Sequence, residues 1–298
     1  MLDTVRLRVL AAVAEHGSVT RAAEQLHYSQ PSVSHHLARL EAETGVRLVQ
    51  RVGRGIRLTA EGALLAQRAT EILGRLAAAD EELAAAIGLR TGRIRVGGFQ
   101  SVFSTVVPQA ASRLLAAHPA IDLQMTDVHP ELALRMLRDG QLDCAVIFRY
   151  DDERPEGVRT VPLFEDDMQL LSLRAGDTLA DHRESPWIAG CERCRGDFTR
   201  VCEAAGFTPR IAFTCEDLIV EQALVAAGLG VTTVPKLSLR SHHAPGVMAT
   251  PVPGFRRRVM LATFGEPPDP PATAAFAAAL IAVVEDGRRP GDPVTRTS

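Results

Sequence analysis

The sequence lacks the features that mark exported and membrane proteins. Its longest uncharged apolar-rich run, Pro270 to Val284, spans 15 residues, whereas about 20 are needed to cross a bilayer. No opening stretch joins a basic end to an apolar core and a small-residue cleavage site, so a secretory signal is not expected. Five cysteines, an odd number in a chain of this length, argue against a disulfide scaffold and indicate reduced thiols in the cytoplasm.

Motifs of catalysis are also lacking. The sequence contains no Gly-rich phosphate loop, no HExxH and no GxSxG, so we expect neither an enzyme nor catalytic residues, cofactor or bound metal. Asp166-Asp167 is an acidic pair, which a solvated hinge loop explains as well as an active site does. A cleft in such a protein would bind a metabolite without transforming it.

Lysine is almost absent, and the positive charge is unevenly placed. Of 33 basic residues only Lys236 is lysine, and the net charge is −3, so bulk charge indicates no polyanionic partner. From Thr44 to Ala60, however, there are four arginines and no acid. Such a run beside a Gly-rich turn suits contacts to phosphate, although a solvated loop has the same composition.

What is present begins with three short predicted helices in the first 45 residues. Asp3, Ser18 and Ser29 are typical N-cap residues, and Gly17 and Gly45 are typical helix ends. Pro31 falls in the first turn of the third helix, where a missing N–H costs little. The apolar faces expected to form a small core are Leu7, Leu10 and Val13; Ala22, Ala23 and Leu26; and Val33, Leu37 and Leu40.

The second and third helices, joined through His27-Tyr28, form a predicted helix-turn-helix. The third helix exposes short polar side chains near its start, as a helix that enters the major groove of DNA requires. After Gly45, the segments 46–51 and 56–58 alternate around Gly53-Arg54-Gly55, which predicts a β-hairpin whose arginine tip reaches phosphate or the minor groove. The expected DNA contacts are Ser29, Gln30, Pro31, Ser32, Ser34, His35, Arg39, Arg51 and Arg54.

The next segment, residues 59–90, is a predicted long helix that Thr59 caps. Apolar residues recur in it with a mean spacing near 3.5, which is the period of a coiled-coil seam. We expect the seam to pair two subunits, and the alternative is a helix packed on its own domain. The seam residues are Leu65, Ala69, Ile72, Leu76, Ala79, Leu83 and Ile87.

From Gly92 onward, apolar strands alternate with helices, which predicts α/β lobes built on a parallel sheet covered on both faces. Two such sets follow one another, so we expect two lobes with a cleft between them. The predicted strands are 94–96, 121–126, 143–148, 169–172, 211–213 and 231–234, and the predicted helices are 102–118, 130–138, 197–205, 217–227 and 273–285. Residues 287–298 are polar and are expected to form a loose tail.

Several of these segments together resemble a known family. Ser29-Gln30-Pro31-Ser32-Val33-Ser34, Leu40-Glu41, Gly45-Val46-Arg47-Leu48 and Leu58-Thr59-Ala60-Glu61-Gly62 resemble the DNA-binding domain of LysR-type transcriptional regulators. Leu224-Val225-Ala226-Ala227-Gly228-Leu229-Gly230, followed by Val234-Pro235, is similar to the family's effector-domain signature. Gly228 suits a left-handed helix end, and Gly230 suits a close backbone approach.

The resemblance implies an α/β multidomain protein: a winged helix-turn-helix over 1–58, a dimerising linker helix over 59–90, and a two-lobed effector-binding domain over 91–286 that is shaped like a periplasmic binding protein. It implies a sequence-specific regulator that binds double-stranded DNA at a pseudo-palindromic promoter site, as a dimer or tetramer. A small-molecule effector in the cleft modulates it, and RNA polymerase is a further candidate partner. The sequence departs from the family at His35, where many relatives have arginine.

The effector cleft is expected beyond the ends of the strands and at helix starts. The candidate effector-binding residues are Gln100, Ser101, Phe148, Arg149, Glu216 and Thr232. The resemblance also favours the Ser101 and Arg149 positions. Arg149 suits a carboxylate effector through a bidentate pair, and its alternative is an ion pair with Asp151 or Asp152.

The cysteines leave a second function open. Cys191-Glu192-Arg193-Cys194 lies near a predicted helix start beside arginines, which favours thiolate, and Cys202 follows. Thiol or metal sensing is therefore an alternative, although a zinc site would need a fourth ligand such as Cys215 or His182. Ordinary buried thiols explain the same residues, and Cys144, within an apolar strand, is expected in the core.

Overall fold

The computed structural model describes residues 2–52, 55–86, 92–151, 155, 157–190, 192–265 and 267–287. The chain forms two compact units, one of residues 1–93 with 135–143 and the other of the remainder. Among the described residues, no helix is both long enough and apolar enough to cross a membrane.

The first unit begins with the three short helices that the sequence predicts, α1 (Thr4–His16), α2 (Val19–Leu26) and α3 (Gln30–Thr44). The side chains of Asp3, Ser18 and Ser29 each accept a backbone N–H in the first turn of the helix that follows. Gly17 and Gly45 end α1 and α3 in the left-handed conformation. The predicted caps are therefore confirmed, and they fix the angles at which the helices meet.

A hairpin of β1 (Val49–Val52) and β2 (Gly55–Leu58) follows α3, with the antiparallel pairing that the sequence predicts. Glu41 on α3 anchors the hairpin. Its Oε1 accepts hydrogen bonds from the backbone N–H groups of Leu48 and Val49, at 2.8 and 3.2 Å. Its Oε2 pairs with Arg47 at 3.1 Å. Leu48 is buried in one core with side chains of α1, α2 and α3.

The long helix α4 (Ala60–Ala86) starts at the predicted cap, where Thr59 Oγ1 accepts the Gly62 N–H at 2.9 Å. Gly62 allows a close approach, since a Cβ there would lie 1.9 Å from the Leu48 carbonyl oxygen. The predicted seam divides into two parts. Ala69 is fully buried and Leu65 packs against the core of the first unit, whereas the seam side chains from Ile72 onward that are described are exposed. The start of the seam therefore packs within the first unit itself.

The second unit contains a six-stranded sheet in the order β4-β3-β5-β10-β6-β9. Its strands are β3 (Arg93–Gly98), β4 (Asp122–Asp127), β5 (Cys144–Arg149), β6 (Arg159–Ser172), β9 (Thr232–Pro235) and β10 (Met248–Thr263). β3 and β5 are parallel, but β10 runs antiparallel to both of its neighbours, as β6 does to β9. The expectation of a parallel sheet is therefore wrong, and the sheet is mixed.

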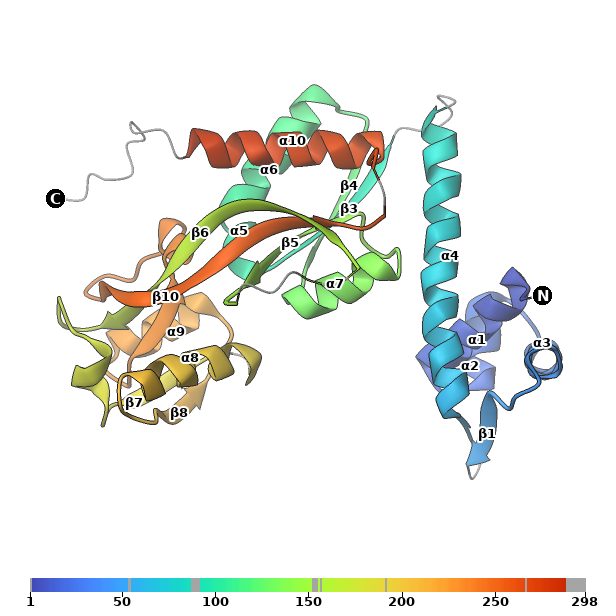
Figure 1. Ribbon diagram of the computed structural model, residues 1–298, viewed down its shortest axis with the longest axis horizontal. Helices are drawn as coiled ribbons and strands as arrows, with labels where there is room; N and C mark the ends of the chain where they lie inside the picture. The colour runs from blue at the N-terminus through green and yellow to red at the C-terminus, as the bar shows by residue number, and fades with distance from the viewer. Residues whose placement is uncertain are drawn as a thin grey trace. The chain divides into compact units, whose positions relative to one another are not determined.

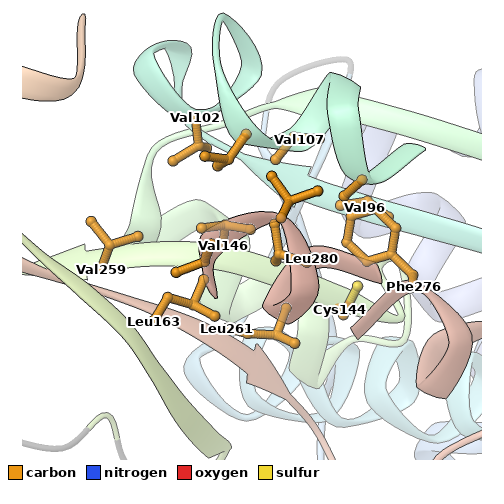
Figure 2. Close-up of a cluster of buried hydrophobic side chains, with 14 of the residues drawn as sticks. Val96, Val102, Val107, Cys144, Val146, Leu163, Val259, Leu261, Phe276 and Leu280 are labelled. Atoms are coloured by element: carbon orange, nitrogen blue, oxygen red, sulfur yellow. The ribbon is translucent and has the colours of Figure 1, made fainter. Parts of the chain in front are cut away.

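One face of this sheet is covered by α6 (Val106–Ala117) and α10 (Pro271–Asp286), which pack together (Figure 1). Phe276 and Leu280 of α10 meet Val96, Val146 and Leu261 of the strands in a buried cluster (Figure 2). The predicted helix 102–118 is two helices, because α5 (Gln100–Phe103) ends before Thr105, whose non-helical backbone precedes α6. The helix α7 (Pro130–Arg138) has its predicted bounds.

The second lobe contains the parallel pair β7 (Pro186–Ala189) and β8 (Arg210–Thr214), with α8 (Glu192–Ala204) and α9 (Leu218–Ala226). Trp187 is fully buried there and packs beside Phe198 and Cys202. Two short 3-10 helices, η1 (Leu179–His182) and η2 (Lys236–Arg240), complete the fold.

The strands β6 and β10 belong to both lobes and lie side by side along most of their length (Figure 1). Leu163 and Val259 are in the core beside α10, whereas Met168 and Phe255 are in the core around Trp187. The sequence predicted only the last residues of β6 and none of β10. Both strands carry prolines, at Pro162, Pro251 and Pro253, that interrupt the strand pattern.

A buried polar cluster supports the turn before β7. Asp177 Oδ2 lies 2.9 Å from His182 Nε2 and accepts from Ser172 Oγ at 3.0 Å, while His182 Nδ1 lies 3.0 Å from Ser185 Oγ. Burial opposes the charge on Asp177, but the hydrogen bonds from His182, Ser172 and Arg174 outweigh it and lower the pKa of this carboxyl. His182 is thus engaged within the protein, and it is no zinc ligand in this arrangement.

The lowered pKa of Asp177 predicts how acid acts on the second lobe. The stability that this carboxylate contributes is present above its ordinary pKa of 3.8 and is lost as the pH falls through the lowered value. Thermal unfolding followed from pH 5 downward, in steps of about half a unit, should show a shallower acid loss for Asp177→Asn than for the wild type. Asp122→Asn, at an exposed position of β4, is the control and should follow the wild type; parallel curves for all three proteins would contradict the assignment.

Candidate functional site

The exposed edge of α3 carries the side chains predicted to read DNA. Gln30, Pro31, Ser34, His35 and Arg39 are all exposed, while Val33, Leu37 and Leu40 on the opposite side are buried. The Ser29 hydroxyl is used in capping, since its Oγ accepts the Ser32 N–H at 3.3 Å. The start of α3 therefore offers small polar groups on a rigid, capped helix, which is the form that a groove-reading helix requires.

The two histidines of α3 have different surroundings. His36 stacks on Tyr28, with ring centroids 5.8 Å apart and planes at 29°, so His36 contacts protein. His35 meets His36 edge-on and remains exposed. Of the wing arginines, Arg54 and the side chain of Arg51 lie outside the described residues.

The second unit contains a cavity of about 480 Å³ between its lobes, a volume typical of small-molecule sites. Its walls come from α5 and the residue before it, from the end of β4 and the loop that follows, from β5, β6, β7, β9 and β10, and from the first turns of α8 and α9. The lining residues are Phe99, Gln100, Ser101, Asp127, Val128, His129, Phe148, Tyr150, Met168, Ile188, Ala189, Gly190, Arg195, Phe198, Glu216, Asp217, Leu218, Glu221, Thr232, Thr233, Pro235, Phe255 and Arg257.

All but one of the predicted effector-binding residues line this cavity, the exception being Arg149. The guanidinium of Arg149 makes a two-fold contact with Asp151, through Nε at 3.0 Å and Nη2 at 2.9 Å. The sequence predicts this ion pair as the alternative role of Arg149, and the prediction that Arg149 holds a carboxylate effector has no support in this geometry.

Sequence reasoning missed the cation at the floor of the cavity, Arg257. It is 4% exposed and pairs with Asp166, whose Oδ2 lies 3.0 Å from its Nε and 2.8 Å from its Nη2. Its Nη2 also donates to Ser101 Oγ at 2.6 Å. The guanidinium carbon lies 4.7 Å from the ring centres of both Phe99 and Phe148.

Asp166 is therefore a buried structural carboxylate, and the interpretation of Asp166-Asp167 as a solvated loop is wrong for Asp166. Its second oxygen accepts the Leu237 N–H at 2.9 Å. The pair joins neighbouring positions of β6 and β10, and 90 residues separate them in sequence, so no local motif reveals it. Only the run Arg256-Arg257-Arg258 in an otherwise apolar segment marks the place.

Glu221 is the second ionisable group that sequence reasoning missed. Its side chain lines the cavity from α9, is 4% exposed, and accepts a hydrogen bond from Thr232 Oγ1 at 3.3 Å. Burial raises the pKa of Glu221 to about 8, with the charge of Asp217 acting in the same direction. Burial also raises the pKa of Asp127, at the opposite lobe. Glu221 lies in the first turn of α9, where acids are common because they suit the helix dipole, so the sequence gives no signal that separates it from a surface acid.

Glu221 predicts a decline in stability with rising pH. Between 4.5 and about 8 the unfolded chain carries this carboxyl ionised while the folded protein keeps it protonated. The contribution to stability therefore falls as the pH rises, by at most about 1.4 kcal/mol per unit. Denaturant unfolding from pH 5 to 8 should show this decline in the wild type and in Glu285→Gln, an exposed acid on α10, but not in Glu221→Gln. An unchanged slope in Glu221→Gln would contradict the raised pKa.

The glycines after α9 have the geometry that their sequence context predicts. Gly228 has a φ of +72°, and a Cβ on Gly230 would lie 2.6 Å from the Pro186 carbonyl oxygen. This close approach lets Val231 bridge to Trp187 of β7. This bridge holds β7, which lines the cavity, beside the start of β9.

The cysteines divide between core and surface. Cys144 and Cys202 are fully buried, and Cys215 is half-buried. Burial raises the pKa of the Cys202 thiol to about 12, which disfavours thiolate there. Cys191 and the side chain of Cys194 lie outside the described residues. Within the described part of the chain, no three histidine, cysteine, aspartate or glutamate residues gather as metal ligands do.

Comparison with known proteins matches both units. Residues 5–63 match the bacterial regulatory helix-turn-helix protein model of the lysR family, and residues 88–285 match the LysR substrate binding domain. The chain is similar to the HTH-type transcriptional regulator YofA of Bacillus subtilis, with 30% identity over 258 residues that cover 85% of this chain and 88% of the relative. It is also similar to a probable hydrogen peroxide-inducible genes activator of Mycobacterium avium, with 33% identity over 276 residues covering 88% and 83%.

A solved structure has the same fold. Full-length CbnR, a LysR family regulator determined in complex with its target DNA, superimposes with a TM-score of 0.66 at 24% identity, covering 95% of this chain and all of that one.

Proposed function

Because the chain belongs to the LysR family of bacterial transcriptional regulators, we propose that it binds a pseudo-palindromic promoter site through α3 and responds to a small molecule in the cavity of its second unit. The protein is a DNA-binding transcriptional regulator with an effector-binding domain, and its family is not one of enzymes. We place the DNA-binding domain at 1–58, the linker helix at 59–90, the effector-binding domain at 91–286 and a tail at 287–298. We also propose that the protein acts in the cytoplasm.

The observation that carries the DNA-binding part is the exposed polar start of α3. Gln30, Pro31, Ser34 and His35 take the base-facing positions, and Arg39 lies further along the same exposed surface. Ser29, Ser32, Arg51 and Arg54 take the positions that contact the phosphate backbone. With His35 in place of the family's arginine, one guanidinium fork is missing from the groove, so Gln30 carries more of the base readout.

Self-association supplies the second half-site that one winged helix-turn-helix lacks. Ile72, Leu76 and Leu83 of α4 are 42%, 45% and 63% exposed. Their spacing places them along one side of the helix. A second copy of α4 covering this stripe makes the dimer, which is the unit that reads a two-fold symmetric site, and two dimers make the tetramer. RNA polymerase is a further candidate partner at the promoter.

Gln30→Ala tests the base-reading role. In gel-shift titrations with the promoter fragment upstream of its own gene, we expect a loss of about ten- to a hundredfold in preference over unrelated DNA, because one bidentate base contact is worth about 1–3 kcal/mol. Binding to unrelated DNA should be unchanged. Gln124→Ala, the same change at an exposed position of β4, is the control and should keep the wild-type preference. Full discrimination by Gln30→Ala would remove Gln30 from the readout.

The effector part is tested by titrating metabolites against thermal stability and against the promoter fragment. A ligand of the folded state raises the unfolding midpoint. An effector raises the midpoint and also changes the affinity for DNA. If ligands raise the unfolding midpoint but leave the affinity for DNA unchanged, the cavity binds small molecules without regulating DNA binding.

A second function, sensing by thiols, is favoured by one observation. The Mycobacterium avium relative is a probable hydrogen peroxide-inducible genes activator, and this chain has Cys191 and Cys194 in a CxxC arrangement. The buried Cys202, with its raised pKa, does not supply a ready thiolate. Counting thiols with a colouring reagent before and after peroxide decides this, since unchanged counts remove the redox function.

A further inference from the structure

Glu221 presents a carboxyl group to the cavity with most of its hydrogen-bonding capacity unused. Within the described part of the chain, its side chain makes one hydrogen bond, the 3.3 Å contact from Thr232 Oγ1 to Oε2. Oε1 borders Gly190, where even an added Cβ would stand 3.8 Å away. A carboxylate has about four acceptor sites. The Glu221 carboxyl therefore faces a small-molecule site without the hydrogen-bond donors that its ionised form needs.

The other charges of the cavity do not favour an anion. Asp127, Glu216 and Asp217 line it together with Glu221, against the cationic Arg195 and Arg257 and the titratable His129. Arg257 is already neutralised by Asp166, bonded to Ser101 and in contact with two phenyl rings on one side. A carboxylate ligand would have to displace these contacts and approach the acidic side chains of Asp127, Glu216 and Asp217.

Aromatic rings form a wall of the same cavity. Tyr150 stacks on Phe255, with ring centroids 5.3 Å apart, and meets Phe148 edge-on at 5.6 Å. Rings of this kind pack against an apolar body and attract a cation that lies over their faces. The cavity thus combines an apolar wall with an acidic one.

We propose that the effector of this regulator carries an organic cation, an amine, amidine or guanidine on an apolar or aromatic body, with Glu221 as its counter-ion. The proposal rests on the proposed effector role of the cavity and names the chemical class of the ligand. The cation donates its N–H groups to Oε1 and Oε2, and the aromatic wall covers the body.

Binding of such a cation is coupled to a proton. In the empty cavity Glu221 is protonated below its raised pKa of about 8. When the cation binds, the carboxyl releases its proton to solvent and remains as the carboxylate, so charge balances within the site. In the described part of the chain, the other ionisable groups that line this site are Glu216 and Asp217 before α9, Arg195 on α8, Arg257 on β10, Tyr150 after β5, and His129 and Asp127 from the other lobe.

A matched set of probes tests the proposal on the full chain: benzamidine, benzamide and benzoate, which share size and planarity and differ in charge. We expect benzamidine, at concentrations up to about 10 mM, to raise the unfolding midpoint. Benzoate should leave the midpoint unchanged, and benzamide should have a smaller effect than benzamidine. A benzamidine effect no larger than that of benzoate overturns the proposal.

Calorimetric titration gives the second readout. For benzamidine, Glu221→Gln should weaken binding by at least about thirtyfold, because it removes one member of a buried charge pair. The Glu221→Gln substitution should also abolish proton release, measured by comparing buffers of different ionisation enthalpy at pH 7. Glu285→Gln should keep both the affinity and the proton release. If Glu221→Gln binds benzamidine as the wild type does, Glu221 is not the counter-ion and the proposal fails.

The failure of this inference is distinguishable from failure of the proposed function. An anionic ligand that stabilises the protein and alters binding to its promoter would refute the cation and leave the effector role of the cavity intact. Loss of the promoter complex in every condition would refute the proposed function while the charge preference of the cavity remained measurable.

Discussion

Replacing Arg257 with methionine is expected to lower the free energy of unfolding of the effector-binding domain by about 3–5 kcal/mol. The substitution leaves Asp166 buried, with its side chain 3% exposed, and without its charged partner. It also removes the donor to Ser101 and the guanidinium that contacts the rings of Phe99 and Phe148. Methionine fills much of the space, so the loss reports the uncompensated carboxylate more than a cavity.

The adjacent arginine gives a matched control. Arg256 pairs with Glu165 at 2.9 Å, but their side chains are 59% and 53% exposed. Arg256→Met should therefore change the free energy of unfolding by no more than about 1 kcal/mol. Urea denaturation of both variants at neutral pH makes the comparison. If Arg257→Met lowers the free energy of unfolding by less than about 1 kcal/mol, water or a movement of β10 compensates the charge of Asp166.

The affinity for promoter DNA is expected to fall about 10⁴-fold between 50 and 200 mM salt. The proposed dimer touches about four phosphates per subunit, which gives eight contacts and a slope of log affinity against log salt near −7. A gel-shift series over this range measures the slope. A slope near zero would reject the phosphate-contacting surface of the wing and α3.

Two substitutions separate phosphate contacts from base contacts. Arg54→Ala should weaken binding to all sequences alike and make the slope shallower by about 2 for the dimer, one for each lost contact. Gln30→Ala should leave the slope unchanged and reduce only the preference for the promoter. Equal slopes for Arg54→Ala and the wild type would remove the wing tip from the phosphate contacts.

Local signals explain why the three short helices and the hairpin of the first unit could be predicted. Asp3, Ser18 and Ser29 cap the helices that directly follow them, and Gly17 and Gly45 end two of them. Each of these interactions joins residues that are only a few positions apart, so a short stretch of sequence contains both partners. The same holds for the hairpin, in which Val52 at the end of β1 pairs with Gly55 at the start of β2.

Long-range pairing explains what could not be predicted. Arg257 and Asp166 meet because β10 and β6 pair antiparallel with register shifts, and neither strand has clean alternation. Gly190 after β7 and Glu221 on α9 also come close only in the folded second lobe. The cavity could be located from helix starts and strand ends, but its charge could not, because burial of Glu221 and neutralisation of Arg257 both depend on tertiary contacts.

The sharing of β6 and β10 between two cores has a consequence for biosynthesis. β6 ends at Ser172 and its partner β10 is complete only at Thr263, so a ribosome must add the whole second lobe before the pairing can close. At about 5–20 residues per second, the edge of β6 waits roughly 5–20 s without its partner. During that interval the nascent chain exposes an unpaired strand, a state prone to aggregation. Folding of this domain therefore completes late, and it is the step at which chaperones have most to protect.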